Sequence, residues 1–209
     1  SYMNDPLKIA AAQMNITAEN VKHVYYMVNA KERYEVIKRI ADINPNIYGI
    51  VFCRTRRETK DVANKLMNDG YNADTLNGDL TQAERDEVMG RFRKRQLQLL
   101  VATDVAARGI DIKKMSQVIN FDVPTVAKDY IHRIGRTGRA GDKGKAITLV
   151  SADEFRLLRD IEKLLNQKLE RIEIEGFEPE HVIPLKEKPP KKKFNNKAGF
   201  RKRKRSRKG

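Results

Sequence analysis

Residues 47–58 read Ile-Tyr-Gly-Ile-Val-Phe-Cys-Arg-Thr-Arg-Arg-Glu, an apolar run that passes into a polar turn. A short apolar run without alternation is typical of a strand that is buried on both faces of a sheet. The turn supplies Thr55-x-x-Glu58, the pattern of a capping box at the start of a helix. We therefore predict a strand over Ile47–Cys53 and a following helix that ends at Gly70 and buries Met67 among other residues.

The same strand-to-helix unit recurs along the chain. Apolar or alternating runs predict further strands over residues 21–28, 72–76, 97–102, 118–121 and 146–150. Helical spacing and two more capping patterns predict helices over 31–43, from Thr81, over 126–134 and from Ser151. Strands that alternate with helices predict an α/β fold with an open, doubly wound and mostly parallel sheet. In such sheets, ligands bind beyond the carboxyl ends of the strands.

The length of 209 residues suits one domain with flanking segments. We expect a linker or entry segment over residues 1–20, a folded domain over 21–175 and a basic tail over 176–209. No stretch approaches the roughly 18 apolar residues of a membrane span, and the start has no signal-peptide pattern. The single cysteine, Cys53, is interpreted as a buried structural thiol, which suits a reducing, cytoplasmic setting.

The net charge of +15 is unevenly distributed along the chain. Residues 186–209 carry 13 Lys or Arg and one Glu, whereas the rest carries 30 basic and 27 acidic side chains. A segment of this composition cannot bury enough apolar surface to offset its ordering entropy, so we predict that it is disordered in isolation. Such a tail can neutralise nucleic-acid phosphates without regard to sequence. A merely solubilising extension is the alternative.

Four segments carry residue types that suit phosphate binding. They are Ile50-Val-Phe-Cys-Arg-Thr55, Asn77-Gly-Asp79 with Gln82-x-x-Arg85, Ala102-Thr-Asp-Val-Ala-Ala-Arg-Gly-Ile-Asp111, and His132-Arg-Ile-Gly-Arg-Thr-Gly-Arg139. Arginine presents a rigid fork of donors that matches phosphate oxygens, and glycine lets the backbone approach a ligand closely. The first three segments lie in predicted strand-to-helix turns, and the last begins at the end of a predicted helix.

Taken singly, residues of this kind have simpler structural explanations. Thr55 is more often a helix cap than a ligand contact. Arg85 could be a solvated charge that pairs with Asp86 or Glu84 on the helix surface. His23, in the first predicted strand, is interpreted as an ordinary surface or edge residue. The ordered combination of all four segments outweighs these explanations.

In their order and spacing, the four segments resemble those of the C-terminal half of a DEAD-box RNA helicase, similar to bacterial RhlE-type members. The resemblance covers about residues 20–175 and implies a RecA-like helicase C-terminal domain, with Tyr2–Gln13 belonging to an interdomain linker. Family members fold as two RecA-like domains, and ATP and RNA bind in the cleft between them. The expected partners are therefore RNA and the N-terminal RecA-like domain of the same protein, with no membrane.

The chain contains no G-x-x-x-x-G-K-S/T segment and no Asp-Glu-Ala-Asp. Such segments cradle the phosphates and organise Mg²⁺ in nucleotide hydrolases. We expect ATP with Mg²⁺ as cofactor, the metal and most phosphate contacts coming from the missing N-terminal domain, and no metal ligand in this chain. The chain would then be part of an ATP-dependent RNA helicase that unwinds or remodels duplexes, and would not hydrolyse ATP alone.

The resemblance assigns five residues to the ATP side of the cleft. Arg136 and Arg139 correspond to arginine fingers that reach the γ-phosphate. His132 corresponds to the histidine that couples closure on RNA to hydrolysis. Gly109 and Asp111 correspond to the turn that contacts the ribose of ATP.

The resemblance also assigns contacts to the RNA backbone, namely Thr55, Gly78, Arg85 and Thr103. It assigns interdomain roles to Arg108 and Gln82. Asn77 stands where the family usually has His, which leaves the functional glycine unaffected. Backbone contacts without readout of base edges imply little sequence specificity.

Two other classes of protein stay open on sequence alone. One is an RNA-binding module or adaptor without catalysis, in which the RecA-like domain is a platform for partners. The other is a flavodoxin-like small-molecule binder, which explains the α/β body but leaves the arginine-rich segment His132–Arg139 unexplained.

Overall fold

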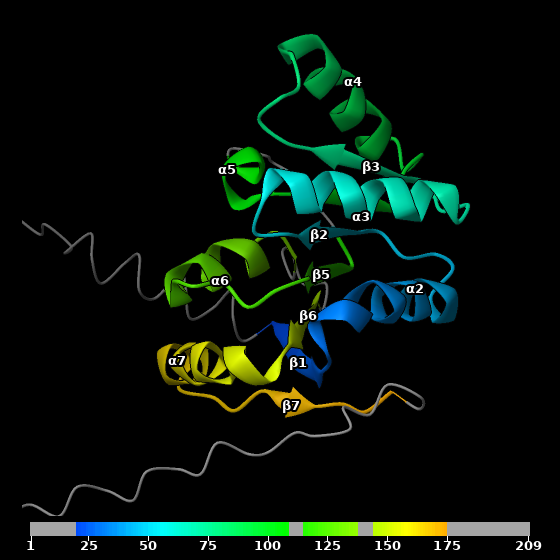
Figure 1. Ribbon diagram of the computed structural model, residues 1–209. Coiled ribbons are helices and arrows are strands. Elements are labelled where there is room, and N and C mark those ends of the chain that lie inside the picture. Colours follow the sequence, from blue (N-terminus) through cyan, green and yellow to red (C-terminus); the bar gives the residue numbers. More distant parts are fainter. Residues whose placement is uncertain (1–19, 109–114, 138–143, 175–209) are drawn as a thin grey trace, which may run out of the picture.

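The computed structural model in Figure 1 describes residues 20–108, 115–137 and 144–174. Within these residues seven strands form one sheet in the order β3-β4-β2-β5-β6-β1-β7, and every neighbouring pair is parallel. The strands are β1 (Val21–Met27), β2 (Gly49–Phe52), β3 (Ala73–Leu76), β4 (Leu99–Ala102), β5 (Gln117–Asn120), β6 (Gly144–Val150) and β7 (Glu170–Arg171). The predicted α/β fold with a parallel sheet is confirmed.

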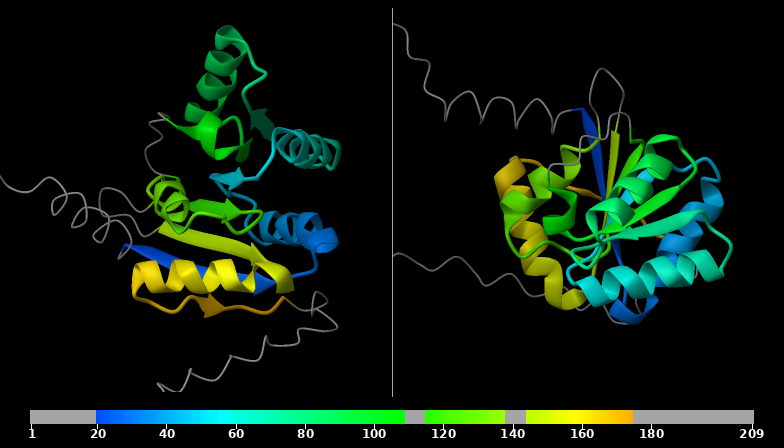
Figure 2. Two further views of the ribbon diagram at one scale, coloured as in Figure 1. Left: turned by 60° about the vertical axis from the view of Figure 1, so that its left-hand side comes forward. Right: turned by 90° about the horizontal axis from the view of Figure 1, so that it is seen from above.

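Helices cover both faces of the twisted sheet (Figure 2). They are α2 (Arg33–Ile43), α3 (Arg56–Asn68), α4 (Gln82–Arg93), α5 (Asp104–Ala107), α6 (Ala127–Ile134) and α7 (Phe155–Leu165), with the short 3-10 helices η1 (Ala30–Glu32) and η2 (Ala152–Glu154). Helices α2 and α3 pack on one face, whereas α4 to α7 pack on the other. In β2, Val51 faces the first layer, and Ile50 and Phe52 face the second. Burial on both faces explains why the whole run is apolar.

The sheet is tightly packed where β2 begins. A Cβ atom on Gly49 would lie 2.6 Å from the carbonyl oxygen of Gln117 in β5. Only glycine therefore allows the two backbones to approach this closely.

The predicted helix starts differ in how completely they are capped. Thr81 with Glu84, and Ser151 with Glu154, form reciprocal capping boxes. Thr55 accepts a hydrogen bond from the backbone N–H of Glu58 at 3.2 Å. The carboxylate of Glu58, however, accepts from the N–H of Arg54 rather than from that of Thr55. All three patterns mark helix starts, and the Ser151 box opens the 3-10 turn that leads into α7.

Two local predictions are wrong. His23 is 3% exposed, and its Nδ1 lies 2.8 Å from the hydroxyl of Tyr130, so it is an interior residue. Met67 is 42% exposed, because it lies on the outer side of α3 while Leu66 fills the core. Within the described residues, no helix has both the length and the apolar character to cross a membrane.

Candidate functional site

Three neighbouring strands bring predicted ligand contacts together at the carboxyl edge of the sheet. In the parallel register, Phe52 of β2 pairs with Ala102 of β4, which pairs with Leu76 of β3. Because the strands end level with one another, the residues that follow them lie side by side. These residues include three of the predicted RNA contacts: Thr55, Gly78 and Thr103.

Both threonines are helix caps in this structure. Thr55 begins α3, and the hydroxyl of Thr103 accepts a hydrogen bond from the N–H of Ala106 at 3.3 Å to begin α5. A hydroxyl that accepts from the backbone still carries its own proton, which it can donate to a phosphate oxygen. Capping and ligand contact are therefore compatible roles for the same side chain.

Gly78 lies in an exposed turn between β3 and α4. The side chain of Asn77 is buried and accepts a hydrogen bond from the N–H of Asp79 at 2.9 Å, which fixes this turn. A Cβ atom on Gly78 would meet nothing closer than Cδ of Arg56 at 3.9 Å. Folding therefore does not require glycine here, and the backbone at Gly78 is open to the close approach of a ligand.

Arg85 reaches from α4 to α5. Its Nη2 donates to the carbonyl oxygen of Ala106 at 2.7 Å. The acceptor on the same helix, Asp86, instead takes a hydrogen bond from Gln82 at 2.8 Å. Arg85 thus connects the first turn of α4 with the short helix α5, which Thr103 begins.

Two of the residues predicted for the ATP side, His132 and Arg136, lie at the end of α6. The side chain of His132 is 69% exposed, and its Nδ1 lies 3.8 Å from a carboxylate oxygen of Asp129. Arg136 follows the last turn of α6, where its N–H donates to the carbonyl oxygen of Arg133 at 3.2 Å. Arg108 is exposed where α5 ends. Three predicted residues lie outside the described part of the chain: Gly109, Asp111 and Arg139.

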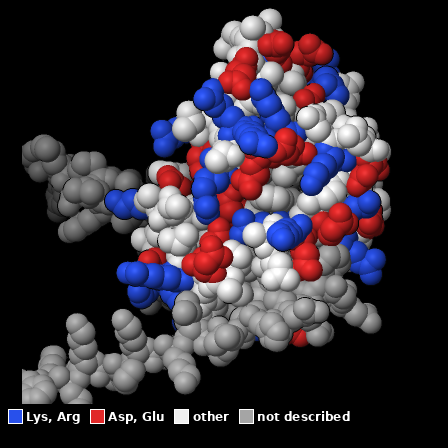
Figure 3. Space-filling model, in the orientation of Figure 1, with Lys and Arg blue, Asp and Glu red and all other residues white. Residues whose placement is uncertain are grey.

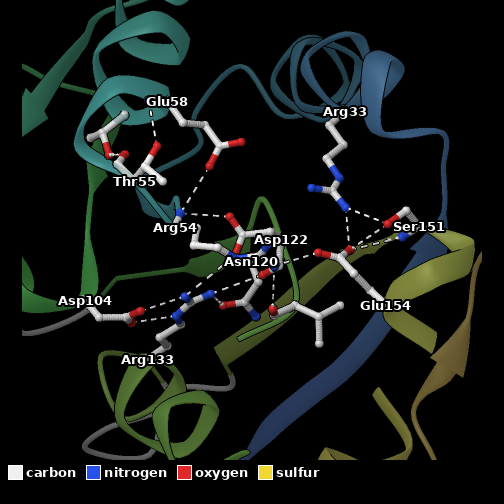
Figure 4. A network of polar contacts seen from close by, with 12 residues as sticks. Arg33, Arg54, Thr55, Glu58, Asp104, Asn120, Asp122, Arg133, Ser151 and Glu154 are labelled. Carbon is white, nitrogen blue, oxygen red and sulfur yellow. Dashed lines mark hydrogen bonds and ion pairs between the residues drawn. The ribbon is translucent and has the colours of Figure 1, made fainter. Parts of the chain in front are cut away.

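A cluster of buried charges, which sequence reasoning did not assign, lies beneath this edge (Figure 4). Arg133 is 2% exposed and binds both carboxylate oxygens of Asp104, at 2.6 and 2.7 Å. Its Nη1 donates to the side chain of Asn120 at 3.1 Å and to the carbonyl oxygen of Asp122 at 3.2 Å. The guanidinium also lies 5.1 Å from the ring centroid of Phe52.

The cluster continues on the other side of Asp122. The carboxylate of Asp122 accepts from the N–H of Arg54 at 2.8 Å. The Arg54 guanidinium donates to Glu154 at 2.8 Å, and Glu154 also binds Arg33. We call this set the buried ion cluster: Arg33, Arg54, Asp104, Asp122, Arg133 and Glu154. Its members are buried except at its margin, where the side chains of Arg54 and Asp104 are 48% and 30% exposed. The cluster joins the turns after β2, β5 and β6 to α2, α5 and α6.

The electrostatics of the cluster centre on Asp122. Burial raises the pKa of this carboxyl group from 3.8 to about 6, although Arg133 and Arg54 act in the opposite direction. Glu58, on α3, adds to the rise. Desolvation therefore outweighs the neighbouring cations, as is common for a carboxylate removed from water.

The buried ion cluster has a geometric consequence for the edge. It fixes Arg54, which directly precedes Thr55, and Arg133, which lies three residues before Arg136. Three of its members, Arg54, Asp104 and Arg133, lie within the sequence segments already noted. These charged residues had no assigned ligand, and this was the signal in the sequence from which the cluster could have been found. Within the described ranges, no group of three or more His, Cys, Asp or Glu side chains could hold a metal ion.

Sequence comparison connects this α/β domain to helicases. The family described as "Helicase conserved C-terminal domain" matches residues 32–141. The ATP-dependent RNA helicase DbpA of Bacillus subtilis is 38% identical over 198 residues, which cover 92% of this chain and 41% of that protein. The DEAD-box ATP-dependent RNA helicase CshA of Geobacillus kaustophilus is 40% identical over 171 residues, covering 82% of this chain and 37% of that protein.

Solved structures agree with this relationship. The Escherichia coli DEAD-box protein SrmB, in its complex with the regulator of ribonuclease activity A, matches with a TM-score of 0.73 and 36% identity. That match covers 77% of this chain and 95% of the SrmB chain. The C-terminal domain of the DEAD-box protein Dbp5 matches with a TM-score of 0.69 and 34% identity, over 74% of this chain and 91% of that chain.

The fold thus defines a RecA-like α/β domain, and its candidate site lies at the carboxyl ends of the strands. The chain belongs to the family of helicase conserved C-terminal domains, and it is of the DEAD-box class. It spans about two fifths of the length of the curated relatives that it matches.

Proposed function

We propose that the chain acts as the second domain of an ATP-dependent RNA helicase. In this proposal it works with the N-terminal RecA-like domain of the same protein to couple ATP hydrolysis to the unwinding or remodelling of RNA duplexes. The observation that carries the proposal is the row formed by Thr55, Thr103 and Gly78 at the ends of three adjacent strands.

This row suits an RNA backbone. It offers the exposed Thr55, a Thr103 that is 8% exposed, and an unobstructed backbone at Gly78, and Arg85 lies at the same edge. Hydroxyl, backbone N–H and guanidinium groups are the usual donors to phosphate and sugar oxygens. Because such contacts do not read base edges, we propose binding that is largely independent of sequence. The basic tail at 176–209 would add further affinity of the same kind.

The end of α6 suits the charge of a triphosphate. Arg136 follows a helix that the buried ion cluster fixes, and we propose that Arg136 and Arg139 stabilise the charge that develops on the γ-phosphoryl group. His132 would contact the opposing domain, while Gly109 and Asp111 would hold the ribose. Bound ATP with Mg²⁺ supplies the phosphoryl group that is transferred to water.

Three further features belong to this proposal. Residues 21–175 form the domain, and residues 1–20 belong to the linker. Arg108 and Gln82, both exposed at the same edge, contact the N-terminal domain in the closed state. The enzyme works in the cytoplasm.

The proposal is tested in a chain that includes the N-terminal RecA-like domain. Arg136→Ala is expected to lower ATP turnover at saturating RNA by about 10³–10⁵-fold, because the transition state loses a preorganised donor. Arg136→Lys should not restore turnover, because lysine lacks the planar fork. Binding of a non-hydrolysable ATP analogue should weaken much less.

Arg156→Ala is the matched control, because Arg156 is an exposed arginine on α7. It should leave turnover unchanged. Near-normal turnover of Arg136→Ala would show that the finger role is wrong and that the arginine-rich segment has a structural or RNA-binding role instead.

A further inference from the structure

A shallow groove lies beside the proposed RNA row, on the outside of α3 and of the turn after β3. Its volume is about 580 Å³, and every residue that lines it is of a polar or charged type: Thr55, Arg56, Arg57, Lys60, Asp61 and Asp79. In the space-filling view, Lys and Arg side chains gather over the amino-terminal half of α3, with acidic side chains among them (Figure 3). The groove is thus a charged surface that opens next to Thr55.

Two cations in this groove converge on a single carboxylate. Nη1 of Arg56 lies 2.7 Å from one oxygen of Asp79, and Nζ of Lys60 lies 2.7 Å from the other. The side chains of Arg56 and Lys60 are 65% and 48% exposed. Each cation therefore binds one oxygen of the Asp79 carboxylate while it remains open to solvent.

A phosphodiester group fits the same arrangement. Like a carboxylate, it presents two equivalent charged oxygens on one central atom, and Arg and Lys are its most common protein ligands. The carboxylate of Asp79 neutralises only one of the two positive charges that face it. Arg56 and Lys60 can therefore bind an external anion in place of the Asp79 carboxylate, with both cationic groups facing that anion.

We propose that Arg56 and Lys60 form a clamp for an RNA backbone phosphate, and that Asp79 occupies this clamp when RNA is absent. The inference rests on the proposed function, because it places the RNA strand along Thr55 and Gly78. Asp79 directly follows Gly78, so a strand that reaches Gly78 brings its phosphates next to the Asp79 carboxylate. Repulsion between the two anions then releases the cations to the phosphate.

The role of Asp79 as an internal competitor has a measurable consequence. A competitor that must be displaced lowers the apparent affinity for RNA, and removing it should raise that affinity. A purely structural ion pair would behave in the opposite way, because its loss would loosen the turn at Gly78 and weaken binding. The sign of the effect of Asp79→Asn therefore separates the two roles.

The test measures binding of the full 209-residue chain to a fluorescein-labelled single-stranded oligouridine, at several salt concentrations. Asp79→Asn is expected to bind roughly two- to fivefold more tightly than the unmodified chain, the range expected for releasing exposed ion pairs. Loss of the clamp in Arg56→Gln with Lys60→Gln should make the dependence of log K on log salt shallower by about 0.7, because one phosphate fewer is neutralised. Arg56→Gln with Lys60→Gln should weaken binding and abolish the effect of Asp79→Asn.

The groove provides charge-matched controls. Asp61→Asn removes the same charge from the same groove, but Asp61 pairs only loosely with Arg57, at 3.9 Å. Asp61→Asn should therefore give a smaller gain, and Arg57→Gln should cost less than Arg56→Gln. The proposal is overturned if Asp61→Asn and Asp79→Asn have equal effects, or if Asp79→Asn weakens binding.

Two further measurements distinguish the proposed RNA clamp from a site for free polyphosphate and from the proposed enzyme activity. Tripolyphosphate that displaces the RNA probe at equal phosphate concentration would indicate a site for free polyphosphate and overturn the assignment to an RNA strand. Failure of the proposed enzyme would appear instead in ATP turnover of the two-domain protein. The affinity change in Asp79→Asn is measured in the absence of ATP, so the two failures are distinguishable.

Discussion

Two clusters of arginine and aspartate lie at the same edge of this domain, and they differ mainly in burial. In the buried ion cluster, Arg133 binds Asp104 at 2.6 and 2.7 Å with an arginine side chain that is 2% exposed. In the groove, Arg56 binds Asp79 at 2.7 Å with an arginine side chain that is 65% exposed. The bond lengths alone do not distinguish the two pairs.

Burial determines what each cluster can do. A charge that has left water cannot lose its partner without a large penalty, so the buried cluster holds its geometry. A charge at the surface loses little when its partner is exchanged, because solvent screens it in either state. The interior cluster therefore suits the positioning of neighbouring segments, and the surface cluster suits exchange with a ligand.

The largest expected effect follows from removing Arg133. Arg133→Ala leaves Asp104 and Asp122 without their main cation and opens a cavity beside Phe52, so we expect a loss of about 3–5 kcal/mol in the free energy of unfolding. Urea denaturation followed by circular dichroism measures this loss. Arg156→Ala, at an exposed position, should change stability by less than about 0.5 kcal/mol. A loss below about 1 kcal/mol for Arg133→Ala would be typical of a surface ion pair. The pair Arg133–Asp104 would then not differ in strength from the pair Arg56–Asp79.

An intermediate effect concerns the pH dependence of stability. The folded-state pKa of Asp122 is raised from 3.8 to about 6 by burial, so ionising this group costs folding free energy. Its contribution to stability is therefore greatest below about pH 4 and declines as the pH rises through 6, by on the order of 3 kcal/mol for a shift of this size. Asp122→Asn cannot ionise and lacks this decline.

The measurement is the difference in unfolding free energy between Asp122→Asn and the unmodified chain, from pH 4.5 to pH 7. That difference should shift in favour of the variant as the pH rises. Taking the difference removes the contribution of the other carboxyl groups. A constant difference across the range would mean that Arg54 and Arg133 keep Asp122 ionised throughout.

Local signals in the sequence were sufficient for much of the fold. A capping box involves residues three positions apart, so Thr81 and Ser151 could be recognised directly as helix starts. Helix α5 has four residues and β7 has two, so neither is long enough to show a periodic pattern. His23 was misjudged because its burial depends on α6, where its partner Tyr130 lies 107 positions away.

The positions of the candidate site residues were predictable to the same extent, while their roles, which the family resemblance implies, stay predictions. Turns after strands could be found from composition, and parallel pairing then brings Thr55, Gly78 and Thr103 together. The buried ion cluster could not be derived in this way. Its contacts join residues 29 positions apart for Asp104 and Arg133, and 100 positions apart for Arg54 and Glu154. Which charges meet depends on the order of strands in the sheet, which no local pattern determines.

The smallest expected effect is on the stability of the groove variants. Arg56→Gln and Asp79→Asn should unfold at a urea midpoint indistinguishable from that of the unmodified chain, because their ion pairs are screened by solvent. Hydrogen bonding to Lys60 and the charge of Arg56 lower the pKa of Asp79 from 3.8. Any contribution of the pair to stability is therefore present at neutral pH and is lost only as the pH falls below that value.

The same variants should still change RNA affinity, so the groove would affect binding without affecting folding. Arg133→Ala should show the opposite pattern. Its stability should fall strongly, whereas its RNA affinity should match that of the unmodified chain under conditions in which the variant is folded. If Arg56→Gln instead destabilised the fold as much as Arg133→Ala, the surface pair would be structural. Asp79 would then be a component of the turn, and burial would not be what separates the two clusters.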